Sequence, residues 1–313
     1  MNFSDYSLFG VCAALQSAVS CNLLDELWRG PGSSAELASR TNCDPSATER
    51  VLSVLAAVGA LTRNGESYAL SERFSEAVGR GPGGWPAFRA LWAHTPEFLR
   101  SGARLRKMDG SGAQRAEEYS GTVSGLGELF GGAAALLSTR LPARRQILDV
   151  GAGSGVWSLA MLAASSDARA TALDFEAVLP NFRGRAERLG LADRVQSLAA
   201  NFHDFTPEPR FDRVVLANVL HLESEASAAA LVARSAQAVT PSGDIVIVDV
   251  LDELGRDVAH AAYNLHLAMR TQGGRAHPTS FLRTTLKRAG FHGIELIDLS
   301  TEVEALGALL ATR

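Results

Sequence analysis

The residues with the clearest chemical potential lie in a glycine-rich segment near the middle of the 313-residue chain. Residues 147–155 read Ile-Leu-Asp-Val-Gly-Ala-Gly-Ser-Gly, an apolar strand that opens into glycines, and a helix is expected from Val156. Glycine lets the backbone approach a ligand, and the first turn of a helix offers N–H groups to an anion. Val156 replaces the third glycine of a dinucleotide site, and no lysine follows as in a phosphate-binding loop. The pattern predicts an anion smaller than a pyrophosphate; its plainer interpretation is a tight turn.

A carboxylate follows at the end of the next expected strand. Asp174 lies nineteen residues after Gly155. A carboxylate in this place can accept hydrogen bonds from both hydroxyls of a ribose. The glycine loop and Asp174 together therefore suit a nucleoside joined to a group that bears a carboxylate.

The elements that position these residues follow an alternating order. After Gly112 a helix is expected to about Arg140, and short apolar runs then alternate with helix-like segments, which is typical of a parallel sheet covered by helices. The fold class is therefore α/β with a doubly wound sheet. The expected strands are 147–150, 170–174, 195–198, 213–217, 245–250 and 294–299.

The N-terminal part has a different pattern, in which helices precede a hairpin. Apolar residues recur at helical spacing over 8–28, and serine and Asp-Pro caps predict two shorter helices. This order predicts a winged-helix domain over 1–110, followed by a second domain over 111–313. The expected elements are helices over 8–28, 34–41 and 45–59, a hairpin over 61–70 with Asn64-Gly65 at its turn, a loop over 79–86, a helix over 88–107 and a linker over 107–112.

Composition excludes several classes of protein. The formal net charge is -4, and residues 1–70 hold seven Asp and Glu against four Arg, opposite to the charge of a nucleic-acid binder. Three cysteines without a CxxC pair indicate neither a disulfide framework nor a zinc site, which favours the cytoplasm. The first residues lack a basic leader and no apolar run reaches about 18 residues, so neither export nor a membrane location is expected.

These motifs resemble the class I S-adenosylmethionine-dependent methyltransferases, and more narrowly the small-molecule O-methyltransferases of plants and bacteria with an N-terminal winged-helix dimerisation domain. The resemblance covers nearly the whole chain. It implies a Rossmann-like methyltransferase sheet in which the glycine loop holds the methionine part of S-adenosyl-L-methionine and Asp174 holds its ribose. Residues 200–203 read Ala-Asn-Phe-His where the family has an adenine-contacting Asp. The residues implied to contact the cofactor are Gly151, Gly153, Asp174, Asn201, Phe202 and Ala217.

The resemblance also implies a general base, His221. The family carries this histidine in a Leu-His-Asp-Trp context, and residues 220–223 here read Leu-His-Leu-Glu. A neutral imidazole could take the proton of a phenolic hydroxyl as its oxygen attacks the sulfonium methyl group in line. Asp249 aligns with the first of two acidic residues that flank the base in plant members, and Ala276 stands at the second. The alternative is a structural histidine, with catalysis by proximity and alignment.

The segment 261–277, with its Gly273-Gly274 turn, resembles the wall of the family's acceptor pocket. No metal is expected, because a histidine base makes one unnecessary. The implied partners are a small-molecule acceptor and a second copy of the chain in a twofold homodimer, with no nucleic acid and no membrane. The candidate acceptor-binding residues are Tyr119, His260, Asn264, Met269 and Arg270.

The expected function is methyl transfer to a hydroxyl of an aromatic or polyketide-type secondary metabolite. One alternative keeps the fold and cofactor but catalyses decarboxylation, hydroxylation or cyclisation. A DNA-binding regulator is disfavoured because the helix 45–59 carries Arg50 as its one basic residue. A nicotinamide oxidoreductase is disfavoured by Val156 and by the methyltransferase-like Asn201-Phe202 segment.

Overall fold

The computed structural model describes residues 3–79, 84–105, 129–208, 210–255, 257–301 and 303–313. The chain divides into two compact units, Met1–Arg80 and Gly81–Arg313. The boundary expected from the sequence lay at residue 110, and the linker expected over 107–112 falls outside the described residues. Two helices, α6 and α7, therefore join the second unit.

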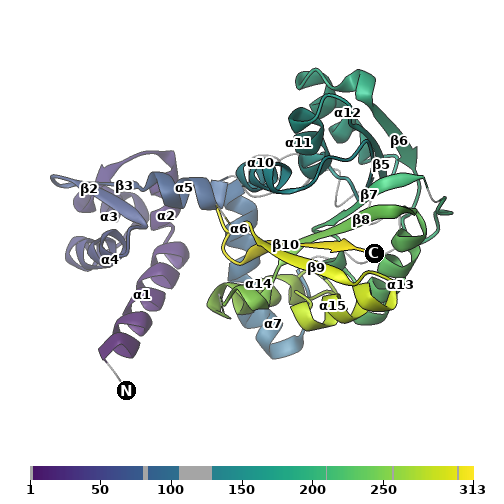
Figure 1. Ribbon diagram of the computed structural model, residues 1–313. Helices are drawn as coiled ribbons and strands as arrows, with labels where there is room; N and C mark the ends of the chain where they lie inside the picture. Colours follow the sequence, from purple (N-terminus) through teal and green to yellow (C-terminus); the bar gives the residue numbers. More distant parts are fainter. Residues whose placement is uncertain (1–2, 80–83, 106–128, 209, 256, 302) are drawn as a thin grey trace. The chain divides into compact units, whose positions relative to one another are not determined.

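The first unit has the helix and hairpin order of a winged-helix domain (Figure 1). Its three short strands form an antiparallel sheet in the order β1-β3-β2. The elements are α1 (Phe3–Ser20), α2 (Leu23–Arg29), β1 (Gly32–Ser33), α3 (Ser34–Thr41), α4 (Pro45–Ala57), β2 (Leu61–Asn64), β3 (Ser67–Leu70) and α5 (Glu72–Gly79).

Side-chain caps set the starts of the short helices, as the sequence predicts. The Ser33 hydroxyl accepts from the Glu36 backbone N–H, and the Glu36 carboxylate accepts from the Ser33 backbone N–H, so α3 begins with a capping box. The Asp44 carboxylate caps α4 in the same way, and Pro45 occupies its first turn.

Two local predictions in this unit are wrong. The single helix expected over 8–28 is broken, because Asn22 adopts a left-handed conformation (φ 59°) between α1 and α2. The hairpin turn lies at Gly65-Glu66 and not at Asn64-Gly65, since Asn64 still pairs with Ser67. Gly65 supplies the positive φ, 60°, that this turn needs.

Two further predictions, over residues 79–107, also differ from the structure. The loop expected over 79–86 is wrong at both ends, because α5 extends through Gly79 and α6 begins at Gly84; residues 80–83 lie outside the described residues. The helix expected over 88–107 is split in two, since Pro96 cannot continue α6 and opens α7 instead. The part of this prediction beyond residue 105 lies outside the described residues.

The second unit is a seven-stranded sheet in the order β6-β5-β4-β7-β8-β10-β9, parallel from β6 to β8. Strand order reverses direction between β4 and β7, and ligands of such sheets bind at that edge. The main helices and strands are α6 (Gly84–Ala93), α7 (Thr95–Ser101), α10 (Gly131–Arg140), β4 (Gln146–Val150), α11 (Val156–Ala164), β5 (Arg169–Asp174), α12 (Leu179–Arg188), β6 (Val195–Ala199), β7 (Phe211–Ala217), α13 (Glu225–Gln237), β8 (Val239–Val250), α14 (Asp257–Ala268), α15 (Thr279–Arg288), β9 (Gly293–Asp298) and β10 (Leu306–Thr312), and the 3-10 turns are η2 (Ala192–Arg194), η3 (Leu220–Leu222) and η4 (Asp252–Leu254).

Helices cover both faces of the sheet (Figure 1). Alternate residues of a strand face opposite sides. Ile147 and Val215 pack in the core formed with α10, α11 and α12, whereas Leu148 and Val214 pack in the core formed with α13 and α15. The near-continuous apolar character of these strands follows from burial on both faces.

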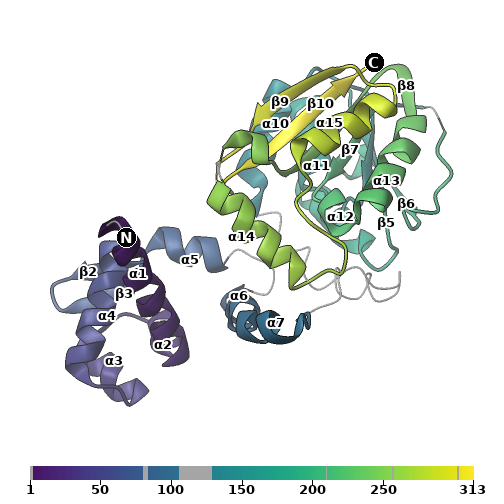
Figure 2. The ribbon, with the colours of Figure 1, turned by 90° about the horizontal axis from the view of Figure 1, so that it is seen from below.

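One strand, β10, is missing from the sequence prediction. It runs antiparallel between β8 and β9 (Figure 2). Residues 306–311 are all buried, so the strand shows no alternation of apolar and polar residues. A short continuous apolar run of this kind is the pattern that a buried strand shares with a helix segment.

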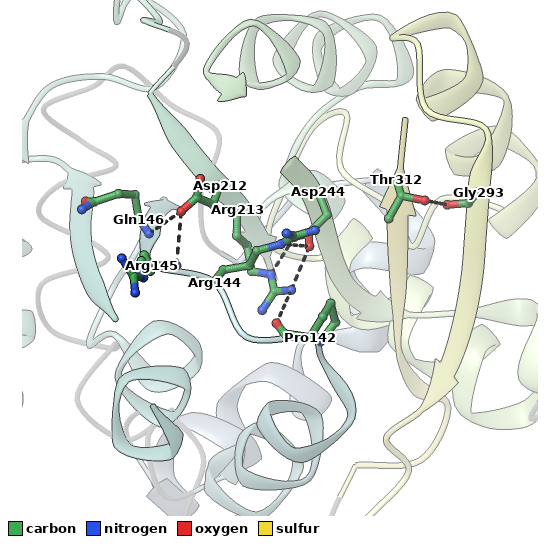
Figure 3. A network of polar contacts seen from close by, with 9 residues as sticks. All are labelled: Pro142, Arg144, Arg145, Gln146, Asp212, Arg213, Asp244, Gly293 and Thr312. Carbon is green, nitrogen blue, oxygen red and sulfur yellow. Dashed lines mark hydrogen bonds and ion pairs between the residues drawn. The ribbon is translucent and has the colours of Figure 1, made fainter. Parts of the chain in front are cut away.

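A buried ion pair connects β7 and β8 near the amino end of β7, away from the cleft at the carboxyl ends of the strands (Figure 3). The Arg213 guanidinium donates to both carboxylate oxygens of Asp244, at 2.6 and 2.9 Å, and to the carbonyl of Pro142 at 3.0 Å. Arg144 donates to the same carboxylate at 2.7 Å. The network joins β7 and β8 to the segment that leads into β4.

Among the described residues no single helix has the length and hydropathy to cross a membrane. Residues 7–20 of α1 and the whole of α2 meet the criterion only when taken together, across a bend of 68°.

Candidate functional site

The glycine loop after β4 has the geometry that its sequence predicts. Gly151, Gly153 and Gly155 all have positive φ, and α11 begins directly after them. A Cβ atom on Gly151 would lie 2.6 Å from the Val219 side chain, and one on Gly155 would lie 2.4 Å from the Phe182 ring. Glycine is therefore required here both for the backbone conformation and for the space.

Asp174 ends β5 beside this loop. Its carboxylate accepts hydrogen bonds from the backbone N–H groups of Gly153, at 2.8 Å, and Phe175, at 2.7 Å. Burial raises the pKa of Asp174, while these two hydrogen bonds act in the opposite direction. The carboxylate is thus fixed at the edge of the sheet where a ribose is expected.

A second carboxylate, Asp149, lies beneath the loop. It is fully buried, and the Ser158 hydroxyl donates to it at 2.5 Å. Burial raises the pKa of Asp149 to about 6, with a smaller contribution from the charge of Asp174. Two acidic groups therefore meet at the carboxyl ends of neighbouring strands.

An open cleft of about 640 Å³ lies at the point where the strand order reverses. Five of the six predicted cofactor residues line it, and Asn201 does not. The lining also includes residues that the sequence analysis missed, among them three aromatic side chains and Asn218, which adopts a left-handed conformation just after β7. The lining residues are Phe130, Gly151, Ala152, Gly153, Ser154, Val156, Trp157, Asp174, Phe175, Phe202, Ala217, Asn218, Val219 and Leu222.

The cleft suits S-adenosylmethionine. Its polar lining includes the glycine loop, the Asp174 carboxylate and Ser154, whose buried hydroxyl lacks a hydrogen-bond partner among the described residues. Its aromatic lining includes Phe175 and Phe202, with ring centroids 6.5 Å apart. A ligand with an amino-acid end, a ribose and a flat base matches this combination of polar and aromatic groups.

Asn201 has a local structural role. Its amide oxygen accepts from the His203 backbone N–H at 3.1 Å, and its amide nitrogen donates to Asp204 at 3.1 Å. These bonds shape the loop that presents Phe202 to the cleft. Of the two residues predicted to contact adenine, Phe202 lines the cleft and Asn201 does not.

His221 and Asp249 form a hydrogen-bonded pair at the carboxyl ends of β7 and β8. His221 lies in η3 and is 6% exposed. Its Nδ1 atom is 2.9 and 3.1 Å from the two carboxylate oxygens of Asp249, and one of these oxygens also accepts from the Val250 backbone N–H. The turn adjoins the cofactor site, because Asn218, Val219 and Leu222 on either side of His221 line the cleft; His221 itself does not line it.

Tyr263 of α14 completes this cluster and was not predicted. Its hydroxyl is 3.4 Å from both ring nitrogens of His221, so it lies beside the Cε1 edge of the imidazole. The two rings meet edge to face, with centroids 5.5 Å apart. The signal in the sequence was a tyrosine within the helix already assigned to the acceptor wall.

The predicted acceptor residues have different surroundings. The Asn264 amide oxygen accepts from the Ala276 backbone N–H at 2.9 Å, and Asn264 also contacts His260. Arg270 donates to His266, whose pKa is lowered to about 3, first by burial and then by this cation. Tyr119 lies outside the described residues.

Met269 packs inside the second unit. It is fully buried, and its sulfur accepts from the Thr95 hydroxyl at 3.7 Å. Its backbone carbonyl accepts from the Leu105 N–H at 2.9 Å. In this structure Met269 therefore anchors the segment after α7 to the end of α14 and presents no open surface to an acceptor.

The fold and the cleft together define a Rossmann-like protein that binds a nucleoside-containing cofactor at the switch point of its sheet. The family model of the O-methyltransferase domain matches residues 111–292, and that of the O-methyltransferase dimerisation domain matches residues 5–76. The chain belongs to this O-methyltransferase family. It is an S-adenosylmethionine-dependent methyltransferase, and S-adenosyl-L-methionine is its cofactor.

The relatives of the chain include enzymes named as O-methyltransferases and one named as a hydroxylase. The tetracenomycin polyketide synthesis 8-O-methyltransferase TcmO of Streptomyces glaucescens is 27% identical over 305 residues, covering 92% of this chain and 89% of the relative. The aclacinomycin 10-hydroxylase RdmB of Streptomyces purpurascens is 28% identical over 290 residues, covering 84% and 76%. The O-methyltransferase NcsB1 from neocarzinostatin biosynthesis, solved with S-adenosylmethionine and 2-hydroxy-5-methyl naphthoic acid, has a TM-score of 0.66 at 20% identity and covers 97% and 96%.

Proposed function

We propose that this enzyme methylates a hydroxyl group of a small aromatic or polyketide-type secondary metabolite, with His221 as the general base. The observation that carries the proposal is the hydrogen-bonded pair of His221 and Asp249 next to the cofactor cleft. The names of the relatives TcmO and NcsB1 support the class of acceptor.

The pair fixes the tautomer that a base needs. Because the Asp249 carboxylate lies against Nδ1, that nitrogen carries the proton and Nε2 keeps its lone pair. The Val250 backbone N–H holds the carboxylate in place. Nε2 can then accept the proton of a substrate hydroxyl, which makes the oxygen a better nucleophile.

The chain's residues position the reacting groups. When bound, S-adenosylmethionine supplies an electrophilic methyl group on its sulfonium. Asp174 and the glycine loop orient the donor in the cleft, and α14 presents Tyr263 beside the base. Burial of His221 excludes water from its hydrogen bond with Asp249. Alignment of the hydroxyl with the donor supplies much of the rate acceleration.

The first unit is proposed to form a homodimer, in line with its match to a dimerisation domain. Leu8, Phe9 and Leu15 of α1 and Trp28 of α2 are large apolar side chains that are exposed in the single chain. Burying them against a second copy would be favourable. Light scattering at micromolar concentration tests this; finding a monomer contradicts it.

A second candidate function is a reaction without methyl transfer on the same scaffold. The similarity to the hydroxylase RdmB favours keeping it. The two candidates differ in the fate of the cofactor, because a methyltransferase converts S-adenosylmethionine to S-adenosylhomocysteine. Chromatography of the cofactor after incubation with a panel of hydroxylated polycyclic aromatics separates them.

Replacing the base tests the mechanism. With an acceptor in hand, His221→Ala is expected to lower kcat by about 100-fold or more, while the Kd for S-adenosylhomocysteine stays within about twofold. Asp249→Asn is expected to lower kcat by at least about tenfold, since it disturbs the tautomer. His292→Ala is the matched control, because it removes an exposed imidazole between α15 and β9, away from the cleft. Unchanged kcat in His221→Ala would eliminate the base.

A further inference from the structure

A buried carboxylate, Glu223, follows directly after the turn that carries His221. Its side chain is 6% exposed and accepts from the Ser227 hydroxyl at 2.6 Å. One of its oxygens lies 3.2 Å from Nε2 of His203.

The partner, His203, belongs to the loop after β6 that carries Phe202 to the cofactor cleft. The Phe202 and His203 rings are 4.7 Å apart, and Phe202 lines the cleft. The far end of this loop is held as well, because Arg234 of α13 donates to the Phe205 carbonyl at 2.8 Å. The loop is thus tied at two points to the segment that follows β7.

The two partners lie directly behind the cleft wall. Phe202 and Leu222 both line the cleft, and each precedes one member of the pair, His203 and Glu223, in the sequence. A bond between the second residues therefore fixes the separation of the first residues. Phe202 is the expected adenine contact, and Leu222 adjoins His221 in the sequence.

The turn around His221 is also held from its other side. The Leu220 carbonyl lies 3.0 Å from Nε2 of His277. A Cβ atom on Gly274 would lie 2.4 Å from the His221 carbonyl, so the 273–274 turn packs directly against η3. The Glu223–His203 pair is a polar link between the end of this turn and the cofactor loop, beside the apolar cluster that Phe202 and Phe205 share with Leu220.

We propose that Glu223 is a positioning residue that, through His203, couples the adenine side of the cofactor site to the turn that carries the base. A bound cofactor orders the loop of Phe202, and the pair transmits that order to η3. Coupling between two sites is reciprocal. Fixing the turn therefore raises the affinity for the cofactor by the same factor by which a bound cofactor favours the fixed turn. The inference rests on the proposed role of His221 for its catalytic meaning, but its affinity consequence does not require that role.

The test is calorimetric titration of the full-length protein with S-adenosylhomocysteine, which needs no acceptor. Glu223→Ala and His203→Ala are each expected to weaken binding at least about fivefold, the lower end of typical couplings between sites. The double variant is expected to be no weaker than either single variant, because each substitution breaks the same link. Glu223→Gln keeps an acceptor within reach of both partners and is expected to restore affinity to within about twofold of the wild type.

Glu225→Ala is the matched control. It removes a carboxylate two residues away whose partner, Arg275, lies outside the cofactor loop. Wild-type affinity is expected for this variant. His203 is about a third exposed, so His203→Ala keeps the test valid if Glu223→Ala does not fold.

Each outcome has a defined meaning. Wild-type affinity in His203→Ala, or losses that add in the double variant, would overturn the coupling. An equal loss in Glu225→Ala would overturn it too, since the effect would then belong to any acid near the turn. Failure of the wild-type protein to bind S-adenosylhomocysteine would instead refute the cofactor assignment, which separates the two failures.

Discussion

The carboxyl of Asp149 makes the stability of the second unit depend on pH. Its pKa is raised from 3.8 to about 6, chiefly by burial. The folded state therefore binds this proton more tightly than the unfolded state does. The contribution of Asp149 to stability is most favourable in acid and declines as the pH rises through the window from about 4 to 6.

The magnitude follows from the two pKa values. One pKa unit corresponds to about 1.4 kcal/mol, so the rise from 3.8 to about 6 costs about 3 kcal/mol in unfolding free energy at alkaline pH. About half of this loss falls between pH 5 and pH 8, because most of the unfolded chains have already released the proton at pH 5.

Asp149→Asn removes the charge and keeps an oxygen that can accept from Ser158. Urea unfolding of both proteins at pH 5, 6, 7 and 8 measures the difference in unfolding free energy. We expect the variant to gain about 1.5 kcal/mol relative to the wild type between pH 5 and pH 8. Ser158→Ala should steepen the loss, since its hydroxyl favours the ionised form. A difference that stays constant with pH would refute the reasoning.

Four further substitutions test other parts of the structure. Gly155→Ala is expected to destabilise by about 3 kcal/mol and to abolish binding of S-adenosylhomocysteine, whereas Gly190→Ala, with positive φ but open space, should cost about 1 kcal/mol of unfolding free energy. Arg213→Ala is expected to cost about 3–5 kcal/mol, because Asp244 is then left buried with one cation fewer. Tyr263→Phe is expected to lower kcat about fivefold with unchanged cofactor affinity. Urea unfolding, calorimetry and turnover assays measure these changes.

Local patterns predicted the strands that carry the site. The glycine loop, Asp174 and the start of α11 follow from short-range rules, since a strand, a turn and a helix are each encoded in neighbouring residues. Helix caps at Ser33 and Asp44 were predictable for the same reason. The break at Asn22 was not, because the apolar spacing continues across it.

Contacts between distant segments were beyond the sequence patterns. The placement of β10 depends on pairing with β8 and β9, and its residues show no alternation because both faces are buried. The local use of Asn201 depends on how the loop after β6 folds back on itself. A motif records which residue types are present and leaves open which way a side chain turns.

The sequence by itself determined the class of enzyme, because a cofactor loop and a ribose carboxylate are separated by one strand–helix–strand unit of fixed size. Only the tertiary structure brought Asp249 to within 2.9 Å of His221, across 28 residues, and placed Tyr263 and Glu223 around the same turn. His221 and Asp249 meet because the carboxyl ends of the parallel strands β7 and β8 lie side by side at one edge of the sheet. That arrangement results from packing the whole chain, and no local spacing encodes it.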